Sequence, residues 1–328
     1  MKKVLVTGSA GHLGEALAWT LTKRNIGCIG IDIKPSTFTT IEASINDRES
    51  VCHAMRRVDT VFHAATLHKP HIITHSKQDF IDTNITGTEI LLEAAIESKV
   101  QRFIFTSTTS TYGHAMSAPK GKPAIWVNEN LVPLVKNIYG ASKLAAENLC
   151  RLAHKESGLN CLILRTSRFF PEEDDSAIVR SGFSADNSKA NEFLNRRAEL
   201  SDIVESHLCA ARRAEDIGFG LYIISATSPF NRYDLNELNQ DAMKVVKRYF
   251  PYYEEIYGRL GWSMTGRLDR VYDNSKAQQE LGWQPHYSFE TVLDGLRKTG
   301  TLPRSDVTSF VGTKGYHEKT FSNGPFPV

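Results

Sequence analysis

Several features that mark secreted, membrane-bound or metal-binding proteins are missing from this chain. Its five cysteines are odd in number, scattered over 328 residues and never in a Cys-x-x-Cys spacing, which argues against a disulfide framework or a zinc site. No apolar run approaches the roughly 18 residues that a membrane span requires, and glycines soon interrupt the apolar start, unlike a secretion signal. We therefore expect no metal, no membrane partner and a reducing, cytoplasmic location.

An excess of charge of one sign is also lacking, because 39 basic and 37 acidic residues are mixed along the chain and leave a net charge of +2. This balance predicts that nucleic acid is not a partner. The composition is ordinary for a globular protein, with 41% hydrophobic and 23% charged residues. A chain of this length can build a large core in one α/β unit or in two packed ones. A small molecule is the expected partner.

The first 165 residues alternate short apolar runs with longer amphipathic stretches, which is the pattern of βα units around a parallel sheet. The predicted strands are Lys3–Thr7, Cys28–Asp32, Thr60–Ala64, Arg102–Ser107 and Cys161–Arg165. The predicted helices lie near His12–Thr22, Arg48–Met55, Gln78–Lys99 and Tyr139–Glu156. Right-handed crossovers then give an α/β fold with a doubly wound parallel sheet, whose ligand crevice lies at the carboxyl ends of the strands.

Three glycines follow the first predicted strand in Thr7-Gly8-Ser9-Ala10-Gly11-His12-Leu13-Gly14. Between a strand and a helix, this pattern is typical of a dinucleotide-binding loop. Gly8 permits the tight turn, Gly11 lets a pyrophosphate approach, and Gly14 lets the helix pack closely on the sheet. The helix start at His12 and Leu13 offers N–H groups and a positive dipole end to phosphates. A tight turn without a ligand is the alternative.

Asp32 ends the next predicted strand, near the spacing at which an acidic residue binds the adenosine ribose, and Ile33 follows it. A carboxylate there repels a 2′-phosphate, so we predict NAD, with NADP less favoured. Lys34 offsets part of that repulsion. Asp32 as a turn former or helix cap is the alternative.

After Arg165 the pattern changes to an acidic run, Pro171–Asp175, and shorter mixed elements. We expect a Rossmann-type dinucleotide-binding domain in residues 1–165 and a smaller C-terminal substrate-binding portion in residues 166–328, which can return a strand or helix to the first domain. Arg168, Arg196 and Arg197 are candidates for holding an anionic substrate, since a guanidinium suits phosphate and carboxylate. Solvated or internally paired arginines are the alternative.

Tyr139 and Lys143 form a Tyr-x-x-x-Lys spacing, which places both on one face of a predicted helix. An ammonium beside a phenol stabilises the phenolate and lowers the Tyr pKa toward the working pH. Tyr139 is therefore a candidate general acid/base. A Tyr and a Lys that simply cover a helix face are the alternative.

The order of these motifs resembles the extended short-chain dehydrogenases/reductases, the family of nucleotide-sugar epimerases and dehydratases typified by UDP-glucose 4-epimerase. The resemblance covers nearly the whole chain. Besides the glycine loop and Tyr139-x-x-x-Lys143, it rests on His63-Ala64-Ala65, Asn84-Ile85-Thr86-Gly87-Thr88, Thr106-Ser107-Thr108, Tyr112-Gly113, Asp273-Asn274-Ser275-Lys276-Ala277 and Leu281-Gly282-Trp283-Gln284-Pro285.

The resemblance implies roles for individual residues. Thr108 would hydrogen-bond the reacting oxygen, Tyr139 would move the proton, and Lys143 would hold Tyr139 and the nicotinamide ribose. Cofactor-lining positions are implied at Ala64, Ala65, Thr66 and Asn84. Helix capping by Asn84 and ordinary packing of the two alanines are the alternatives.

Three departures from the family pattern limit this transfer. Ser44 stands where many relatives place an Asp against the adenine, so Ser44 and Ile45 would make a weaker contact. His68 replaces the epimerase lysine and either binds substrate or is a solvated loop histidine. The segment 166–171, Thr-Ser-Arg-Phe-Phe-Pro, replaces an Asn-containing turn that contacts the substrate diphosphate.

The combined prediction is an NAD-dependent oxidoreductase or epimerase that transfers a hydride to or from a hydroxyl or keto carbon of a sugar or nucleotide-sugar. A reductase or dehydrogenase of a non-nucleotide small carbonyl compound is one alternative. A non-catalytic dinucleotide-sensing protein is the other, because the glycine loop and Asp32 serve either purpose. The resemblance also implies a homodimer that pairs through the helices near Gln78–Lys99 and Tyr139–Glu156.

Overall fold

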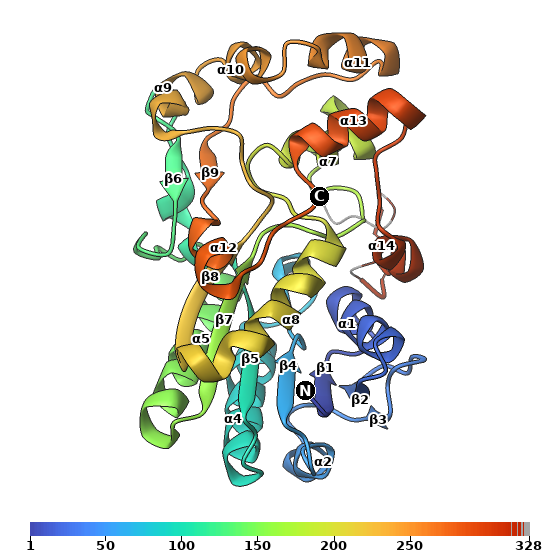
Figure 1. Cartoon of the computed structure of the whole chain (residues 1–328), viewed down its shortest axis with the longest axis vertical. Coiled ribbons are helices and arrows are strands. Elements are labelled where there is room, and N and C mark those ends of the chain that lie inside the picture. Colours follow the sequence, from blue (N-terminus) through green and yellow to red (C-terminus); the bar gives the residue numbers. More distant parts are fainter. Residues whose placement is uncertain (316, 320, 323, 325–328) are drawn as a thin grey trace.

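A seven-stranded sheet forms the centre of the molecule in a computed structural model that describes residues 1–315, 317–319, 321, 322 and 324 (Figure 1). Its strand order is β3-β2-β1-β4-β5-β7-β8, and neighbouring strands are parallel. The strands are β1 (Lys3–Thr7), β2 (Gly27–Asp32), β3 (Ile41–Glu42), β4 (Thr60–His63), β5 (Arg102–Thr108), β7 (Asn160–Thr166) and β8 (Phe219–Ile224). The predicted Rossmann-type α/β class is confirmed, and the five predicted strands occur with bounds that differ by at most one residue.

Helices cover both faces of this sheet because successive strand residues point to opposite sides. Val4 and Val6 of β1 pack in one core with α1 and α8, whereas Leu5 packs in the other with α2, α4 and α5. These helices are α1 (His12–Lys23), α2 (Arg48–Ala54), α4 (Gly87–Glu97), α5 (Ile138–Ser157) and α8 (Leu200–Ile217). Burial on both faces explains the nearly continuous apolar runs of the strands.

The helix expected over Gln78–Lys99 is interrupted. Helix α3 (Lys77–Ile81) leads into a π-helical turn, η2 (Asp82–Thr86), and then into α4. The turn contains Asn84, whose backbone carbonyl oxygen accepts a hydrogen bond from the Thr88 hydroxyl at 2.7 Å. Such π-turns occur frequently at functional sites, and this one brings the Asn84 side chain against the loop that follows β4.

The chain returns to the sheet after residue 165. Helix α8 and strand β8 complete one side of it, and α12 (Ser275–Leu281) packs on both. Trp283, beyond α12, is fully buried and donates its indole N–H to the Asp202 carbonyl oxygen of α8 at 3.0 Å. The sheet is therefore not confined to residues 1–165, because the strand that returns to it, β8, forms the edge next to β7.

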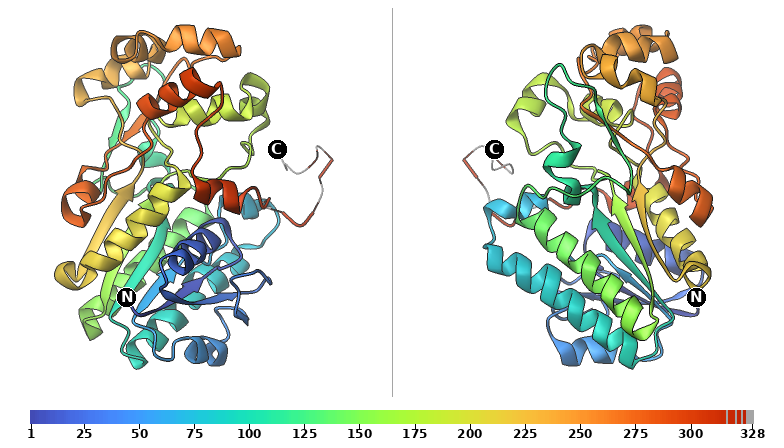
Figure 2. Two further views of the ribbon diagram at one scale, coloured as in Figure 1. Left: turned by 45° about the vertical axis from the view of Figure 1, so that its right-hand side comes forward. Right: turned by 90° about the vertical axis from the view of Figure 1, so that its left-hand side faces the viewer.

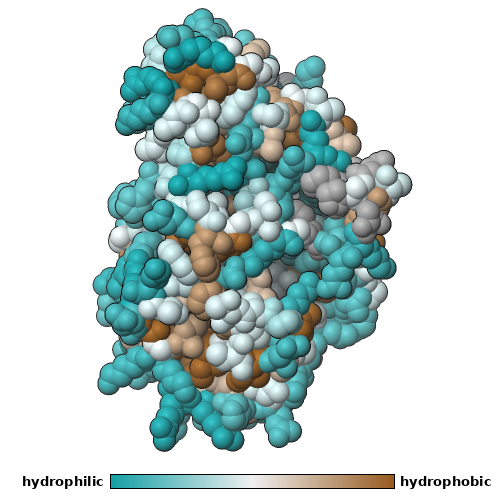
Figure 3. Space-filling view, turned by 90° about the vertical axis from the view of Figure 1, so that its right-hand side faces the viewer, coloured by the Kyte–Doolittle hydropathy of each residue, from teal (hydrophilic) through white to brown (hydrophobic). Residues whose placement is uncertain are grey.

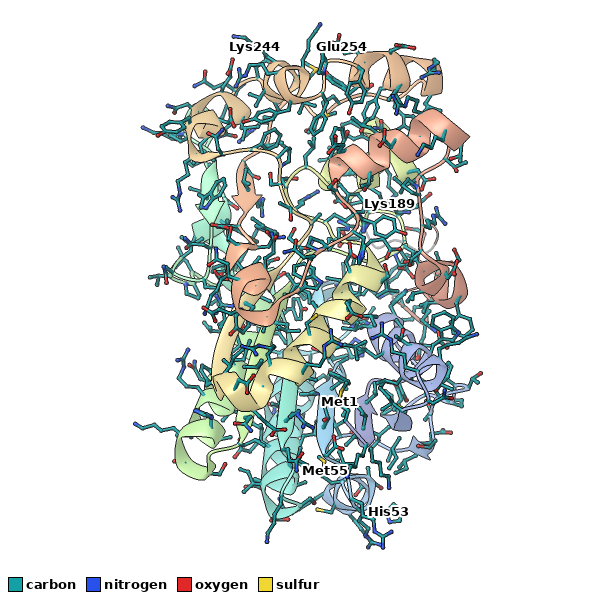
Figure 4. All side chains as sticks on the ribbon, viewed as in Figure 1. Met1, His53, Met55, Lys189, Lys244 and Glu254 are labelled. Atoms are coloured by element: carbon teal, nitrogen blue, oxygen red, sulfur yellow. The ribbon has the colours of Figure 1, made fainter. Side chains whose placement is uncertain are left out.

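The remaining elements form a second layer beyond the carboxyl ends of the strands, with its own apolar cluster built around residues such as Phe250, Tyr257 and Phe289. Lys244 and Glu254 lie in this layer, at the end of the molecule opposite Met55 (Figure 4). Its elements are β6 (Ile125–Val127), α6 (Ala177–Gly182), α7 (Ala185–Glu192), α9 (Leu235–Leu238), α10 (Ala242–Tyr249), α11 (Tyr253–Leu260), β9 (Arg270–Tyr272) and α13 (Phe289–Thr299). Strands β6 and β9 pair in parallel.

Helix α14 (Asp306–Val311) returns to the first layer and lies against α1. Phe310 stacks on Trp19 with ring centroids 5.2 Å apart. The face that carries α1 and α14 is mostly hydrophilic, with small scattered apolar areas (Figure 3). Helix α14 thus lies next to the half of the fold that contains the glycine loop.

Candidate active site

A cleft of about 1230 Å³ opens at the carboxyl ends of the strands, between the two layers. This is the position expected for a ligand in a doubly wound sheet. One continuous wall joins the glycine loop, the end of β2, the loop after β4, the end of β5, the start of α5 and the segment after β7.

The glycine loop is shaped by close backbone contacts. Gly8 has a φ of +71°, and a Cβ there would lie 2.8 Å from the Ala65 nitrogen. A Cβ on Gly14 would lie only 1.9 Å from the Gly8 carbonyl oxygen. The absence of side chains thus keeps the first turn of α1 directly against the loop, and the start of a helix is where N–H groups bind phosphate. Gly8, Gly11, His12, Leu13 and Gly14 all line the cleft, and this cradle fits a dinucleotide pyrophosphate.

Asp32 lies at the next strand end and serves two purposes. Its carboxylate accepts hydrogen bonds from the backbone N–H of Ala10 and of Lys34, each at 2.9 Å. It therefore stabilises the glycine loop while still lining the cleft beside Ile33. The Lys34 ammonium lies 2.9 Å from the Glu318 carboxylate, which partly neutralises the positive charge of Lys34.

Ser44 and Ile45 lie along the cleft wall. The Ser44 hydroxyl accepts a hydrogen bond from the Asn46 N–H at 3.1 Å. Asp47 caps α2 instead, because its carboxylate accepts from the N–H groups of Glu49 and Ser50.

Ala64, Ala65 and Thr66 line the cleft after β4. The N–H groups of both alanines donate to the Thr7 hydroxyl oxygen at 3.1 Å, which joins this loop to β1. Asn84 does not line the cleft. Its buried amide accepts from the Leu67 N–H and donates to the Ser142 hydroxyl, each at 2.9 Å. The structure thus places Asn84 in a tether between the loop and α5.

Tyr139 and Thr108 meet in the cleft at the junction of its two halves. Thr108 ends β5, and Tyr139 is in the first turn of α5, where the Asn137 side chain caps the helix by accepting from the Gly140 N–H at 3.0 Å. Burial raises the pKa of Tyr139 to about 12, and a hydrogen bond with Thr108 opposes this rise. The phenol is therefore protonated at neutral pH.

Lys143 lies on the buried side of Tyr139. Its ammonium sits 3.9 Å from the centroid of the Phe105 ring, and the residue does not line the cleft. Burial lowers the pKa of Lys143 to about 7, opposed by Cys150 and Glu147. The expectation that Lys143 would lower the Tyr139 pKa is wrong for the protein alone, because burial raises that pKa and only the hydrogen bond with Thr108 opposes the rise.

The four candidate substrate residues differ in placement. His68 is half-buried in the cleft wall and stacks on Phe170, with centroids 5.1 Å apart. Arg168 lines the cleft and pairs with Asp174 at 2.5 Å. Arg196 also lines it and pairs with Glu192 at 2.9 Å.

Arg197 is buried and does not line the cleft. Its guanidinium donates to the Phe170 carbonyl oxygen at 2.9 Å and pairs with Glu192 at 3.1 Å. These contacts make it an internal brace, the alternative to a substrate-binding role.

One contact of the site was not expected from the sequence. The His12 imidazole, at the start of α1, lies 2.5 Å from the Glu172 carboxylate, and both are buried. Glu172 also accepts hydrogen bonds from the N–H groups of Lys314 and Gly315 at 2.7 and 3.1 Å. Although burial acts to raise the Glu172 pKa, the hydrogen bonds and charge of His12 and the Lys314 N–H lower it. The acidic run 171–175 was the available signal, but no local pattern pairs residue 172 with residue 12.

Among the described residues, no helix is long and apolar enough to cross a membrane. The same residues contain no group of three or more His, Cys, Asp or Glu side chains that could hold a metal ion.

This fold, with a glycine cradle and a Tyr/Thr pair at the carboxyl edge of its sheet, defines a dinucleotide-dependent oxidoreductase. Residues 4–196 match the model of the NAD dependent epimerase/dehydratase family. The chain belongs to that family and is an NAD-dependent enzyme of the extended short-chain dehydrogenase/reductase type. The predicted enzyme, and not the alternative of a non-catalytic dinucleotide sensor, is therefore confirmed.

Individual relatives agree with this assignment. The UDP-glucose 4-epimerase of Azospirillum brasilense is 32% identical over 174 residues, which are 50% of this chain and 48% of that protein. A quinoline-oxide ketoreductase of Stigmatella aurantiaca is 25% identical and covers 91% of this chain and 96% of its own. The UDP-glucuronic acid 4-epimerase of Bacillus cereus, solved with UDP-glucuronic acid and NAD, has a TM-score of 0.62 at 24% identity and covers 89% of this chain and 96% of its own.

Proposed function

We propose that this enzyme transfers a hydride between NAD and a hydroxyl or keto carbon of a sugar or nucleotide-sugar. The observation that carries the proposal is the single cleft in which the glycine loop, Asp32, Thr108 and Tyr139 all lie. NAD, when bound, accepts or donates the hydride. The relatives named as UDP-sugar epimerases support the substrate class.

The chain's own residues divide the remaining work. The loop from Gly8 to Gly14 and the start of α1 hold the pyrophosphate, and Asp32 holds the adenosine ribose. Thr108 orients the reacting oxygen, and Tyr139 moves its proton. Lys143 supports Tyr139 from the buried side of α5. The C-terminal portion closes the cleft over the substrate through residues such as Arg168.

The raised pKa of Tyr139 supports a specific protonation state. A phenol that is protonated at neutral pH is ready to donate a proton to a keto oxygen, which is the reducing direction. In the oxidising direction a cation beside Tyr139 must favour the phenolate, and protonated Lys143 is the cation that the chain supplies. If the keto product remains bound and is reduced from its other face, the same groups perform epimerisation.

The test compares Tyr139→Phe with the parent protein on UDP-glucose and UDP-glucuronic acid. We expect turnover by the parent with at least one of them, and a loss of about 100-fold or more in kcat for the variant, the range of a general acid/base contribution. NAD binding by calorimetry should not change. Near-normal turnover of Tyr139→Phe would contradict the assigned role.

A second candidate function is reduction or oxidation of a non-nucleotide carbonyl compound. One observation supports it. Arg168 and Arg196 are the arginines best placed to bind a diphosphate, but they already form ion pairs with Asp174 and Glu192. The ketoreductase relative, which is matched over nearly its whole length, points the same way. Turnover of a neutral cyclic ketone with NADH, without turnover of either UDP-sugar, would select this function.

We further infer a homodimer that is formed through α4 and α5, which lie side by side on one face of the sheet (Figure 2, right). Ala94, Ala95 and Ala146 are buried within the protomer, so these alanines serve internal packing. Leu152 of α5 is 47% exposed and is available for pairing. Light scattering should give twice the chain mass, and Leu152→Glu should give the single mass. A monomeric parent would refute the dimer.

All five cysteines are free thiols, which supports a cytoplasmic location.

A further inference from the structure

Beneath the Tyr139/Thr108 pair lies a buried ion pair that connects three elements of the site. The side chains of Glu147 on α5 and Arg165 on β7 are each 4% exposed. Two hydrogen bonds join them: Arg165 Nε donates to Glu147 Oε1 at 2.9 Å, and Arg165 Nη2 donates to Glu147 Oε2 at 2.6 Å. The Ser107 hydroxyl of β5 donates to the same Glu147 carboxylate at 2.5 Å. A single carboxylate thus holds a helix and two strands together.

The two strand partners reach Glu147 because of the sheet register. Ser107 and Arg165 are paired residues of β5 and β7, so their side chains leave the same face of the sheet, the one that α5 covers. The adjacent pair, Thr108 and Thr166, comes next in the register. The Thr166 hydroxyl donates to the Ser107 carbonyl oxygen at 3.0 Å, so the end of β5 is braced from the side as well.

The same ion pair is one and two helical turns from the reactive side chains. On α5, Glu147 follows Lys143 by four residues and Tyr139 by eight, and Ser107 immediately precedes Thr108. A shift at Glu147 therefore moves the helix that carries Tyr139 relative to the strand that carries Thr108. The Arg165 guanidinium also lies 4.6 Å from the Tyr112 ring centroid, and the Tyr112 hydroxyl donates to the Asn128 carbonyl oxygen at 2.9 Å.

Stability alone is a poor reason for such a pair. Removing two charges from water is costly, and buried ion pairs can often be replaced by apolar residues of similar volume without loss of stability. What an apolar pair lacks is direction, because hydrogen bonds fix the relative position of the groups that they join. Misplacement by about 1 Å can reduce a reaction rate about 100-fold.

We propose that Glu147 is a positioning residue for hydride transfer, holding Tyr139 on α5 in line with Thr108 on β5 through its bonds to Arg165 and Ser107. The proposal rests on the proposed function, since it assigns Glu147 to the reaction that Tyr139 and Thr108 perform. The carboxylate acts from behind the site and touches neither cofactor nor substrate.

The test replaces the charged pair by an apolar one in Glu147→Leu/Arg165→Met. We expect a folded protein whose KM and NAD affinity stay within about threefold of the parent, and whose kcat falls at least about tenfold. The matched control is Asp59→Asn/Arg102→Met, which removes a partly buried pair at the opposite end of β5 and should leave kcat unchanged. A folded double variant with a kcat within about twofold of the parent would overturn the proposal.

Two additions keep the outcome decisive. If the double variant does not fold, Ser107→Ala removes only the bond between β5 and Glu147 and is expected to lower kcat with KM unchanged; an unchanged kcat would then refute the role. If the parent turns over neither UDP-glucose nor UDP-glucuronic acid, the proposed substrate class fails separately. Crystal structures of the parent and the double variant then decide, since the Tyr139 hydroxyl must move by about 1 Å relative to Thr108.

Discussion

Replacing Gly14 by alanine tests how the glycine loop holds the cofactor. The added Cβ would lie 1.9 Å from the Gly8 carbonyl oxygen, 2.5 Å from the Gly8 carbonyl carbon and 3.0 Å from the Ser9 Cα. An ordinary contact needs roughly 3.5 Å, so α1 must move away from the loop by about 1.5 Å. All three atoms belong to the backbone, and no flexible side chain can yield.

The magnitude follows from two opposing effects. Overpacking against backbone costs about 1–3 kcal/mol, whereas Ala in place of Gly within a helix contributes about 1 kcal/mol of stability. We expect a net destabilisation of about 1 kcal/mol. The displaced helix also loses at least one charge-assisted hydrogen bond to the pyrophosphate, worth about 1.5–3 kcal/mol, so NAD should bind about 10-fold to 100-fold more weakly.

The assay is calorimetric titration with NAD together with urea unfolding. The matched control is Gly258→Ala in α11, where an added Cβ would meet nothing within 4 Å. This control should gain about 1 kcal/mol of stability and bind NAD like the parent. If Gly14→Ala bound NAD within about twofold of the parent and unfolded at the same urea concentration, the close-packing argument would be wrong.

Two further predictions concern charge and pH. Asp32→Ser removes the carboxylate that repels a 2′-phosphate, so calorimetry should show NADP binding tighten relative to NAD by about tenfold; an unchanged ratio would mean that Asp32 only shapes the loop. Burial lowers the pKa of His207 from its usual value of about 6.5 to about 4, so the unfolded chain takes up the proton first and stability is lost as the pH falls from about 6.5 toward 4. The free energy of unfolding in urea should be about 2 kcal/mol lower at pH 5 than at pH 7 because of His207, and His207→Gln should remove this contribution. An equal loss in the variant would assign the effect to another group, such as the buried His63.

The strands and the glycine loop could be predicted because their determinants are local. Strand β1 is a short apolar run that ends in Thr7 and is followed at once by Gly8, and both faces of the run are buried. The close approach of Gly14 to Gly8 involves residues six positions apart. Patterns on this scale are present in the sequence and do not depend on the rest of the fold.

The placement of individual side chains in and behind the cleft depended on contacts between distant segments. Asn84 and Arg197 have residue types that suit a cofactor or a substrate, but Leu67, Ser142 and Glu192 engage them inside the protein. The pKa of Tyr139 could not be derived from the Tyr-x-x-x-Lys spacing, because the spacing does not encode burial, which raises this pKa to about 12.

The amino-acid sequence by itself determined the class of fold, the dinucleotide loop and the pairing of Tyr139 with Lys143 on one helix face, since strand periodicity and helix spacing operate over a few residues. Only the tertiary structure decided that Glu172 contacts His12 across 160 positions and that Glu147 joins Ser107 to Arg165. Such contacts form only when the sheet brings distant strand ends together. Burial, which exists only in the folded chain, then makes each charged group depend on its partner.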